Sequence, residues 1–175
     1  MIIRKDSGLT LIELLASVSI LAIVLGFAVP TLGGFIQSQR LVAASNELLG
    51  GLMYARATAI KLRQRVTLCR SSDGVNCASD GGYEQGWLVF ADAGVISVRD
   101  GADEVLRTSE GMSDLSISGN TPVRGYVSYL PSGVAQRASG AFQAGTITAC
   151  IDNDGRKLIL NRVGRVRISR DMTGC

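Results

Sequence analysis

Four arginines near the C-terminus are the side chains best suited to chemistry in this chain: Arg162, Arg165, Arg167 and Arg170. Arg165 and Arg167 are two positions apart, so on a strand they project from the same face about 7 Å apart. Their planar guanidinium groups suit phosphate oxygens, and this separation is close to that of phosphates along one nucleic-acid strand. Gly164 permits a tight bend that would present them to solvent. A solvated edge strand whose charges prevent aggregation explains the same pattern equally well.

The net charge of +3 is unevenly distributed along the chain. Residues 71–123 contain nine acidic residues and only two basic ones, Arg99 and Arg107, whereas residues 155–170 contain six basic residues and no acid. This asymmetry indicates an anionic partner for the C-terminal segment. No aromatic residue is interleaved with the four arginines, so stacking on bases is not expected. Nucleic-acid binding here would be weak, independent of sequence and sensitive to salt.

Catalytic and metal-binding patterns are not evident in the sequence. There is no histidine, no nucleophile elbow and no phosphate-cradling glycine loop, and Ser132 follows a proline in an expected turn. Residues 152–155, Asp-Asn-Asp-Gly, offer closely spaced oxygens, but Arg156 and Lys157 follow where a calcium loop needs a later glutamate. An Asp-Gly hairpin turn explains the segment better. We therefore expect no enzymatic activity, cofactor, metal or small-molecule substrate.

Residues 9–29 form an apolar segment long enough to cross a bilayer as a helix, at about 1.5 Å per residue. Its single charge is Glu13, which implies a partner because an unpaired ionisable group at membrane depth costs a few kcal/mol. A secretory signal peptide matches poorly, since the apolar run is too long and no small-residue cleavage site follows it. A plain membrane anchor explains the length but leaves Glu13 without a purpose.

The residues around Gly8 are more specific than the apolar segment itself. Residues 5–8, Lys-Asp-Ser-Gly, followed by Leu-Thr-Leu-Ile-Glu at 9–13, closely resemble the type III signal of type IV pilins and type II secretion pseudopilins. The resemblance implies that a prepilin peptidase cuts between Gly8 and Leu9 on the cytoplasmic side and methylates the new N-terminus. Glu13 then becomes the fifth residue, the hallmark of that family. Leu9 stands where most members have phenylalanine, a tolerated departure.

Electrostatics agree with this resemblance. Cleavage would create an α-amino group on Leu9, and Glu13 is the only carboxylate able to meet such a group within the apolar layer. In a filament, Glu13 of one subunit would neutralise the amine of its neighbour and so set their register. The subunit would first span the inner membrane once, with its globular part in the periplasm, and would then join a pilus at the cell surface.

Beyond the apolar segment, the pattern predicts a continued helix and then short strands. Apolar residues recur at three-to-four spacing as far as residue 62, so we expect one helix over residues 9–61, bent or loosened near Pro30 and Gly33. Gly50 and Gly51 either let a strand approach closely or are tolerated imperfections. Strands are expected at residues 65–69, 86–90, 95–98, 104–107, 115–118, 126–130, 146–151, 157–161 and 166–168. This order predicts an α+β fold with an antiparallel sheet packed on the helix.

Four cysteines follow the apolar segment: Cys69, Cys77, Cys150 and Cys175. In an oxidising periplasm, an even set predicts two disulfides, for which three connectivities are possible. We expect the local pairs, 69 with 77 and 150 with 175, because each closes a loop within one neighbourhood of the chain. Zinc is a poor alternative, since the cysteines include no closely spaced pair and the chain has no histidine.

The whole layout resembles the GspH/FimT subgroup of minor pilins and pseudopilins, whose globular part is a β-sandwich-like sheet over the helix. The implied divisions are a leader at 1–8, a transmembrane and filament-core helix at 9–29, an amphipathic half-helix at 30–63 and a β-rich domain at 64–175. Such a subunit would have as partners the prepilin peptidase, the inner membrane and other pilins.

The C-terminal arginines extend this resemblance to a function. Residues 164–167, Gly-Arg-Val-Arg, match the GRxR motif of FimT-type minor pilins, which bind DNA in natural transformation. The match implies that Arg165 and Arg167 contact the phosphate backbone of extracellular DNA, with Arg162 and Arg170 as auxiliary contacts. The alternative is a structural role without DNA binding, as a FimU-like minor pilin or a GspH-like pseudopilin of type II secretion.

Replacing Glu13 with alanine should prevent incorporation of the subunit into filaments. The neighbouring α-amine would then be buried without a counter-charge, at a cost of roughly 3–5 kcal/mol. Immunoblots of sheared filaments measure incorporation, with Glu13→Asp as the control that keeps the charge. Mass spectrometry of the wild-type subunit should find a methylated N-terminus at Leu9. A mature chain that begins at Met1, or normal incorporation of Glu13→Ala, would contradict this account.

Overall fold

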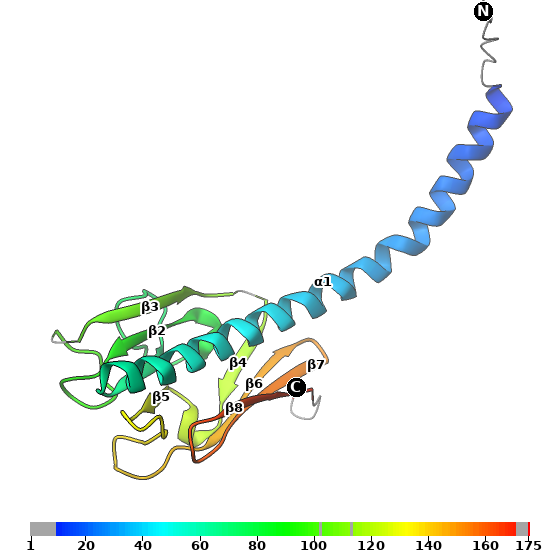
Figure 1. Cartoon of the computed structure of the whole chain (residues 1–175). Helices are drawn as coiled ribbons and strands as arrows, with labels where there is room; N and C mark the ends of the chain where they lie inside the picture. The colour runs from blue at the N-terminus through cyan, green and yellow to red at the C-terminus, as the bar shows by residue number, and fades with distance from the viewer. Residues whose placement is uncertain (1–9, 102, 113, 171–174) are drawn as a thin grey trace, which may run out of the picture. The chain divides into compact units, whose positions relative to one another are not determined.

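The computed structural model of the chain describes residues 10–101, 103–112, 114–170 and 175, including their side chains except at 27–32. The expected leader, Gly8 and Leu9 lie outside these residues. Helix α1 (Leu11–Leu62) precedes all the strands (Figure 1). The chain separates into two compact units, Met1–Gln37 and Ser38–Cys175. In order, the strands are β1 (Val66–Arg70), β2 (Gly86–Ala91), β3 (Val105–Glu110), β4 (Ser116–Gly119), β5 (Tyr126–Tyr129), β6 (Gly145–Ile151), β7 (Asp154–Leu160) and β8 (Val166–Ser169).

The N-terminal unit is the first part of α1. The hydroxyl oxygen of Thr10 accepts a hydrogen bond from the backbone N–H of Glu13 at 3.3 Å, which caps the start of the helix. The side chains of residues 11–26 are exposed, including Leu11 at 80%. Within the part of the chain that is described, no helix combines the length and the apolar character needed to cross a membrane.

The C-terminal half of α1 carries the core of the second unit. Its buried side chains recur every three or four residues, which places them on one face of the helix. They pack in one cluster with residues of both sheets, and Figure 1 shows this half of the helix lying across the strands. The buried helix residues are Leu41, Ala44, Leu48, Leu52, Ala55 and Ala59.

The strands form two antiparallel sheets of four strands each, in the orders β3-β2-β1-β5 and β4-β6-β7-β8. The expected α+β fold is therefore confirmed, with two sheets over the helix. The Asp-Asn-Asp-Gly segment is the β6–β7 hairpin, in which Ile151 pairs with Asp154. Its two turn residues are Asp152 and Asn153, two positions before Asp154-Gly155, so the hairpin is present but not as an Asp-Gly turn. Asp152 adopts a positive φ of 48°.

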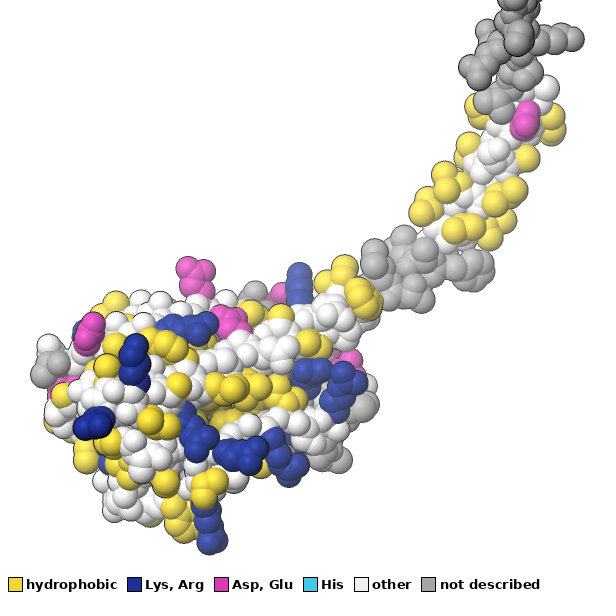
Figure 2. Space-filling model, viewed as in Figure 1, with side chains coloured by type: hydrophobic (Ala, Val, Ile, Leu, Met, Phe, Trp, Pro, Cys, Tyr) yellow, Lys and Arg dark blue, Asp and Glu magenta, His cyan; other side chains and the backbone are white. Residues whose placement is uncertain are grey.

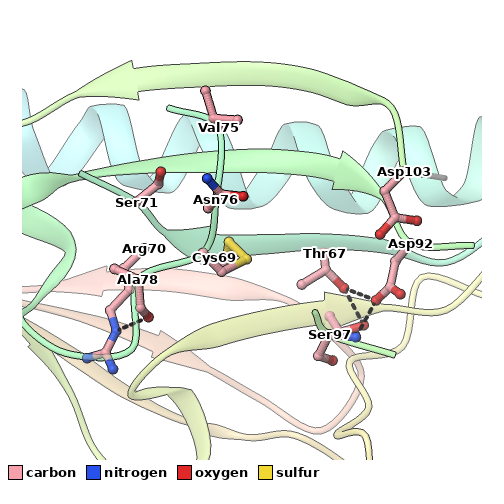
Figure 3. Close-up of a disulfide and its surroundings, with 12 residues drawn as sticks. Thr67, Cys69, Arg70, Ser71, Val75, Asn76, Ala78, Asp92, Ser97 and Asp103 are labelled. Atoms are coloured by element: carbon pink, nitrogen blue, oxygen red, sulfur yellow. Dashed lines mark hydrogen bonds between the residues drawn. A yellow bond between two sulfur atoms is a disulfide. The ribbon is translucent and has the colours of Figure 1, made fainter. Parts of the chain in front are cut away.

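Strands β1 and β2 are buried along their whole length because both of their faces are covered. Val66, Leu68 and Val89 point into the main core, whereas Leu88 and Phe90 pack in a second cluster with Cys69. The disulfide between Cys69 and Cys77 closes the loop over this outer side (Figure 3). Arg70 holds the same loop by donating to the carbonyls of Ala78, Ser79 and Gly81. The second disulfide joins Cys150 to Cys175, so both local pairs are present.

The strand expected at residues 95–98 is wrong. The segment is a looped turn, closed by a hydrogen bond from the Val98 N–H to the Val95 carbonyl at 3.0 Å. Acidic side chains take the backbone donors that a strand would have used. Asp92 accepts from the Ser97 N–H at 2.8 Å and from the Thr67 hydroxyl (Figure 3), and Asp100 accepts from the Val95 N–H at 3.0 Å. Asp103 accepts from the N–H groups of residues 93 and 100, on either side of the segment. Burial raises the pKa of Asp92, and the Thr67 and Ser97 hydrogen bonds oppose that rise.

The paired glycines of α1 have opposite environments. A Cβ on Gly51 would lie 2.6 Å from Cη2 of the Trp87 indole, whereas a Cβ on Gly50 would meet nothing within 4 Å. Of the two interpretations left open for these glycines, close approach of a strand therefore applies to Gly51. Gly50 is the tolerated imperfection.

We expect Gly51→Ala to lower the free energy of unfolding by about 1–3 kcal/mol through overpacking against Trp87. Gly50→Ala, the matched control one residue away, should raise it by up to about 1 kcal/mol through helix propensity alone. Urea unfolding of both variants in mild detergent measures the difference. Equal effects of the two substitutions would show that the indole does not constrain the helix.

Candidate functional site

The four C-terminal arginines lie on and around a tight turn between β7 and β8. The backbone N–H of Gly164 donates to the Asn161 carbonyl at 3.0 Å, and that of Asn161 donates to the Arg165 carbonyl at 3.0 Å. The side-chain oxygen of Asn161 accepts from the N–H groups of Val163 at 3.1 Å and Arg165 at 2.9 Å. An asparagine in this role builds an Asx turn. The turn therefore holds its shape without help from a ligand.

Gly164 is required at this turn for two separate reasons. Its φ of +79° lies in the left-handed region, which side chains disfavour. Its α-carbon also packs so closely that a Cβ would collide with the Gly133 carbonyl oxygen and lie 3.2 Å from Cε1 of Tyr129. The expected tight bend is thus present, and it is pressed against a second turn rather than standing free in solvent.

Arg56 of α1 joins the two turns. Its Nε donates to the Gly133 carbonyl at 2.8 Å and its Nη2 donates to the Val163 carbonyl at 3.0 Å. The Arg56 guanidinium thereby holds the β7–β8 turn against the helix. Sequence reasoning missed this residue. The available signal was a single basic residue between Arg40 and Lys61, placed within the apolar pattern of α1.

The side chains around the turn alternate as the sequence predicts. Arg162, Arg165, Arg167 and Arg170 are exposed, whereas Val166 and Ile168 are half-buried against the core. Arg165 immediately precedes β8, so only Arg167 of the GRxR pair lies within the strand. The Arg162 guanidinium lies 4.4 Å from the centre of the Phe142 ring, a cation–π contact. Basic side chains form a row below α1 (Figure 2).

None of these four arginines forms an ion pair within the described chain, where the recorded ion pair is that of Arg40 with Asp114 at 3.1 Å. Strand β8 is an edge of its sheet, next to β7 alone. The surface formed by these four arginines is therefore available to an external anion. Among the described residues, no group of three or more histidine, cysteine or acidic side chains could hold a metal ion.

The candidate residues for processing and assembly lie near the N-terminus, away in sequence from the arginines. Glu13 lies in the first turn of α1 and is exposed, and its backbone carbonyl accepts from the Ser17 hydroxyl at 2.7 Å. Gly8 and Leu9, the expected cleavage pair, lie outside the described residues.

Comparison with known families identifies this architecture. Residues 44–164 match the family of the type II transport protein GspH, which covers more than half of the chain. The chain belongs to the GspH family. Residues 3–29 match the prokaryotic N-terminal methylation motif. The expected resemblance to minor pilins and pseudopilins is therefore confirmed.

Solved structures agree with this membership at the level of the fold. The GspH-family chain is similar to the type IV minor pilin FimU of Pseudomonas aeruginosa in one crystal form, with TM-score 0.58, 20% identity and coverage of 77% of this chain and 92% of that chain. A second crystal form of FimU gives TM-score 0.55 and 20% identity, covering 73% and 90% respectively. No curated protein matches the chain in sequence.

Family membership and the methylation motif together make the chain a minor pilin or pseudopilin of a type IV pilus or a type II secretion system. Members of this kind assemble with other pilins in a filament, and they are in general structural proteins rather than enzymes. Two roles fit the exposed arginines of the β7–β8 turn: protection of the edge strand β8 from aggregation and contact with an external anion.

The two constraints on Gly164 can be separated experimentally. Gly164→Ala should lower the free energy of unfolding by about 2 kcal/mol or more, because it combines a strained φ with a clash. Gly140 is the matched control, since it has a similar φ of +84° but nothing within 4 Å of its Cβ position. Gly140→Ala should cost only about 1 kcal/mol. Chemical unfolding of both variants checks the prediction, which fails if Gly164→Ala is no worse than Gly140→Ala.

Proposed function

We propose that the chain is a minor pilin of a type IV pilus that binds extracellular DNA without sequence preference, for uptake in natural transformation. The observation that carries the proposal is the set of exposed arginines around the β7–β8 turn, which form no ion pair with any described residue. Their match to the GRxR motif of FimT-type minor pilins is the reason for proposing DNA as the ligand.

Geometry supports phosphate contacts by Arg165 and Arg167. Both side chains are exposed while the intervening Val166 is half-buried, as expected for alternation along an extended segment. Successive phosphates of one strand can therefore meet successive guanidinium groups. Arg162 and Arg170, also exposed, extend the cationic surface on both sides.

Electrostatics set the character of the binding. Residues 155–170 contain six basic residues and no acid, so a polyanion gains from releasing its counterions along the whole segment. Arg162 lies over the Phe142 ring, and no aromatic residue is interleaved with the four arginines, so stacking on bases is not expected. We therefore propose weak, salt-sensitive recognition of the backbone.

The path to the filament is part of the same proposal. Prepilin peptidase would cut between Gly8 and Leu9, and Glu13 would pair with the new amine of a neighbouring subunit. The exposed apolar side chains of residues 11–25 support an inner-membrane location before assembly. The two disulfides support a periplasmic globular domain, because disulfides persist in oxidising compartments.

A second candidate function is structural: a FimU-like minor pilin or a GspH-like pseudopilin that binds only other pilins. The fold likeness to FimU favours it, as do the exposed apolar side chains of Met53 and Ile60 on α1, which suit contact with another subunit. Under this alternative, deletion of the gene abolishes pili or secretion while the purified chain binds no DNA.

The double variant Arg165→Gln plus Arg167→Gln tests the favoured function. The full-length chain in mild detergent is titrated against labelled duplex DNA at several salt concentrations. Losing two phosphate contacts should weaken binding and reduce the slope of log K against log salt by about 1.8.

The matched control is Lys61→Gln plus Arg124→Gln, which removes the same charge from two exposed residues outside the tail. This control should leave most of the affinity and the slope. An unchanged slope in the Arg165 and Arg167 variant would refute the site assignment, and absence of binding by the wild-type chain would favour the structural alternative.

A further inference from the structure

A cleft lies between α1 and the β7–β8 turn, beside the proposed DNA-binding face. Its volume is about 190 Å³, and Figure 2 shows an apolar hollow between the helix and the row of basic side chains. The helix supplies one wall and the turn supplies the other. The lining residues are Leu52, Met53, Arg56, Tyr129, Gly164, Arg165 and Val166.

Two cations converge on this cleft, and one of them is held rigidly. Arg56 is half-buried and is fixed through Nε and Nη2 by the carbonyls of Gly133 and Val163. Its Nη1 makes no hydrogen bond within the described chain. Arg165, on the opposite wall, is exposed and forms no ion pair among the residues that the structure describes. A guanidinium that is already ordered loses little entropy on binding an anion.

Tyr129, at the end of β5, adds an unused donor to the lining of the cleft. Its side chain is fully buried, yet its hydroxyl has no hydrogen-bond partner within the described chain. Burial raises the pKa of Tyr129, while the neighbouring Arg56 lowers it, so the hydroxyl keeps its proton at neutral pH. Buried hydroxyl groups are normally satisfied, and this one lies near the Arg56 guanidinium in a cleft that Arg165 also lines, which indicates an anionic acceptor.

We propose that the cleft holds one phosphate group of the bound DNA strand between Arg56 and Arg165, with the Tyr129 hydroxyl as a third donor. The inference rests on the DNA binding proposed above and deepens it, because it adds a helix residue and a specific subsite to a surface of exposed arginines. The remaining phosphates continue along Arg167 and Arg170.

A phosphate fits this setting better than a carboxylate from another protein. The cleft opens onto a row of arginines without an intervening acid in residues 155–170, which suits a chain of regularly spaced anions. A phosphodiester has two charged oxygens, as a carboxylate does, but it belongs to a repeating chain of anions, so its neighbours can meet Arg167 and Arg170 at the same time.

Two buried tyrosines provide a matched experiment. Tyr83 is buried like Tyr129, but its hydroxyl donates to the Val123 carbonyl at 2.8 Å. Tyr129→Phe should weaken duplex DNA binding about tenfold, the usual effect of one hydrogen bond to a charged acceptor, without lowering Tm. Tyr83→Phe should lower Tm and leave DNA affinity unchanged. Unchanged affinity in Tyr129→Phe would overturn the three-donor site.

Blocking the cleft provides a second readout that leaves its donors intact. Met53 is exposed on the helix wall, so Met53→Glu places a carboxylate at the mouth of the cleft. It should weaken DNA binding at least tenfold and reduce the salt slope by about 0.9, the loss of one phosphate contact. Asn46→Glu is the control, exposed on the same helix two turns earlier, and it should leave the slope unchanged. Equal effects of the two variants would overturn the subsite.

A small probe separates failure of the subsite from failure of DNA binding. Dimethyl phosphate is added to the full-length chain in detergent, and the side-chain Nε–H signals of Arg56 and Arg165 are followed by NMR at constant ionic strength. Shifts that Met53→Glu abolishes support the phosphate subsite even if duplex DNA does not bind, a result that would refute only the proposed function. Absence of shifts overturns the subsite, and larger shifts with acetate overturn the phosphate assignment in favour of a carboxylate from a protein partner.

Discussion

Burial of one face of the C-terminal half of α1 is the constraint on which the globular unit depends. Leu48 and Leu52 are almost completely covered, and burying each such side chain contributes about 1.5–3 kcal/mol. Farther along the helix, the small side chains of the buried Ala55 and Ala59 permit close packing. Gly51, between Leu48 and Leu52, lets the Trp87 indole lie against the helix backbone. Residues of both sheets pack in one cluster with this face of the helix. Each sheet therefore depends on the helix to bury its apolar side chains.

The candidate site is a consequence of that packing. Arg56 is one residue beyond the buried Ala55, at the edge of the apolar face, where its guanidinium can reach the carbonyls of two turns. Gly164 allows the β7–β8 turn to come close enough for this contact. The same hydrogen bonds that stabilise the turns order a cation beside Arg165, so stability and a preorganised anion-binding surface arise from one arrangement.

Local signals were sufficient for most of the elements. The predicted helix at 9–61 agrees closely with α1 at Leu11–Leu62, and eight of the nine expected strands are present, because period and turn residues decide them locally. The strand prediction at 95–98 failed because Asp92 and Asp100 accept hydrogen bonds from the N–H groups of Ser97 and Val95. The apolar, β-branched residues of this segment resemble those of a strand, but Val95 and Val98 are exposed.

The sequence by itself determined the methylation motif, the helix-then-strands order and the exposed character of Arg165 and Arg167, because each depends on residues close together in the chain, whereas it left three disulfide connectivities open. Only the tertiary structure decided that the strands form two sheets, that Gly51 rather than Gly50 contacts Trp87, and that Arg56 and Tyr129 border the Arg165 turn. These three depend on which distant segments pack against α1. Residues adjacent in sequence do not determine which distant segments pack together, because that packing arises from the burial of several apolar faces at once.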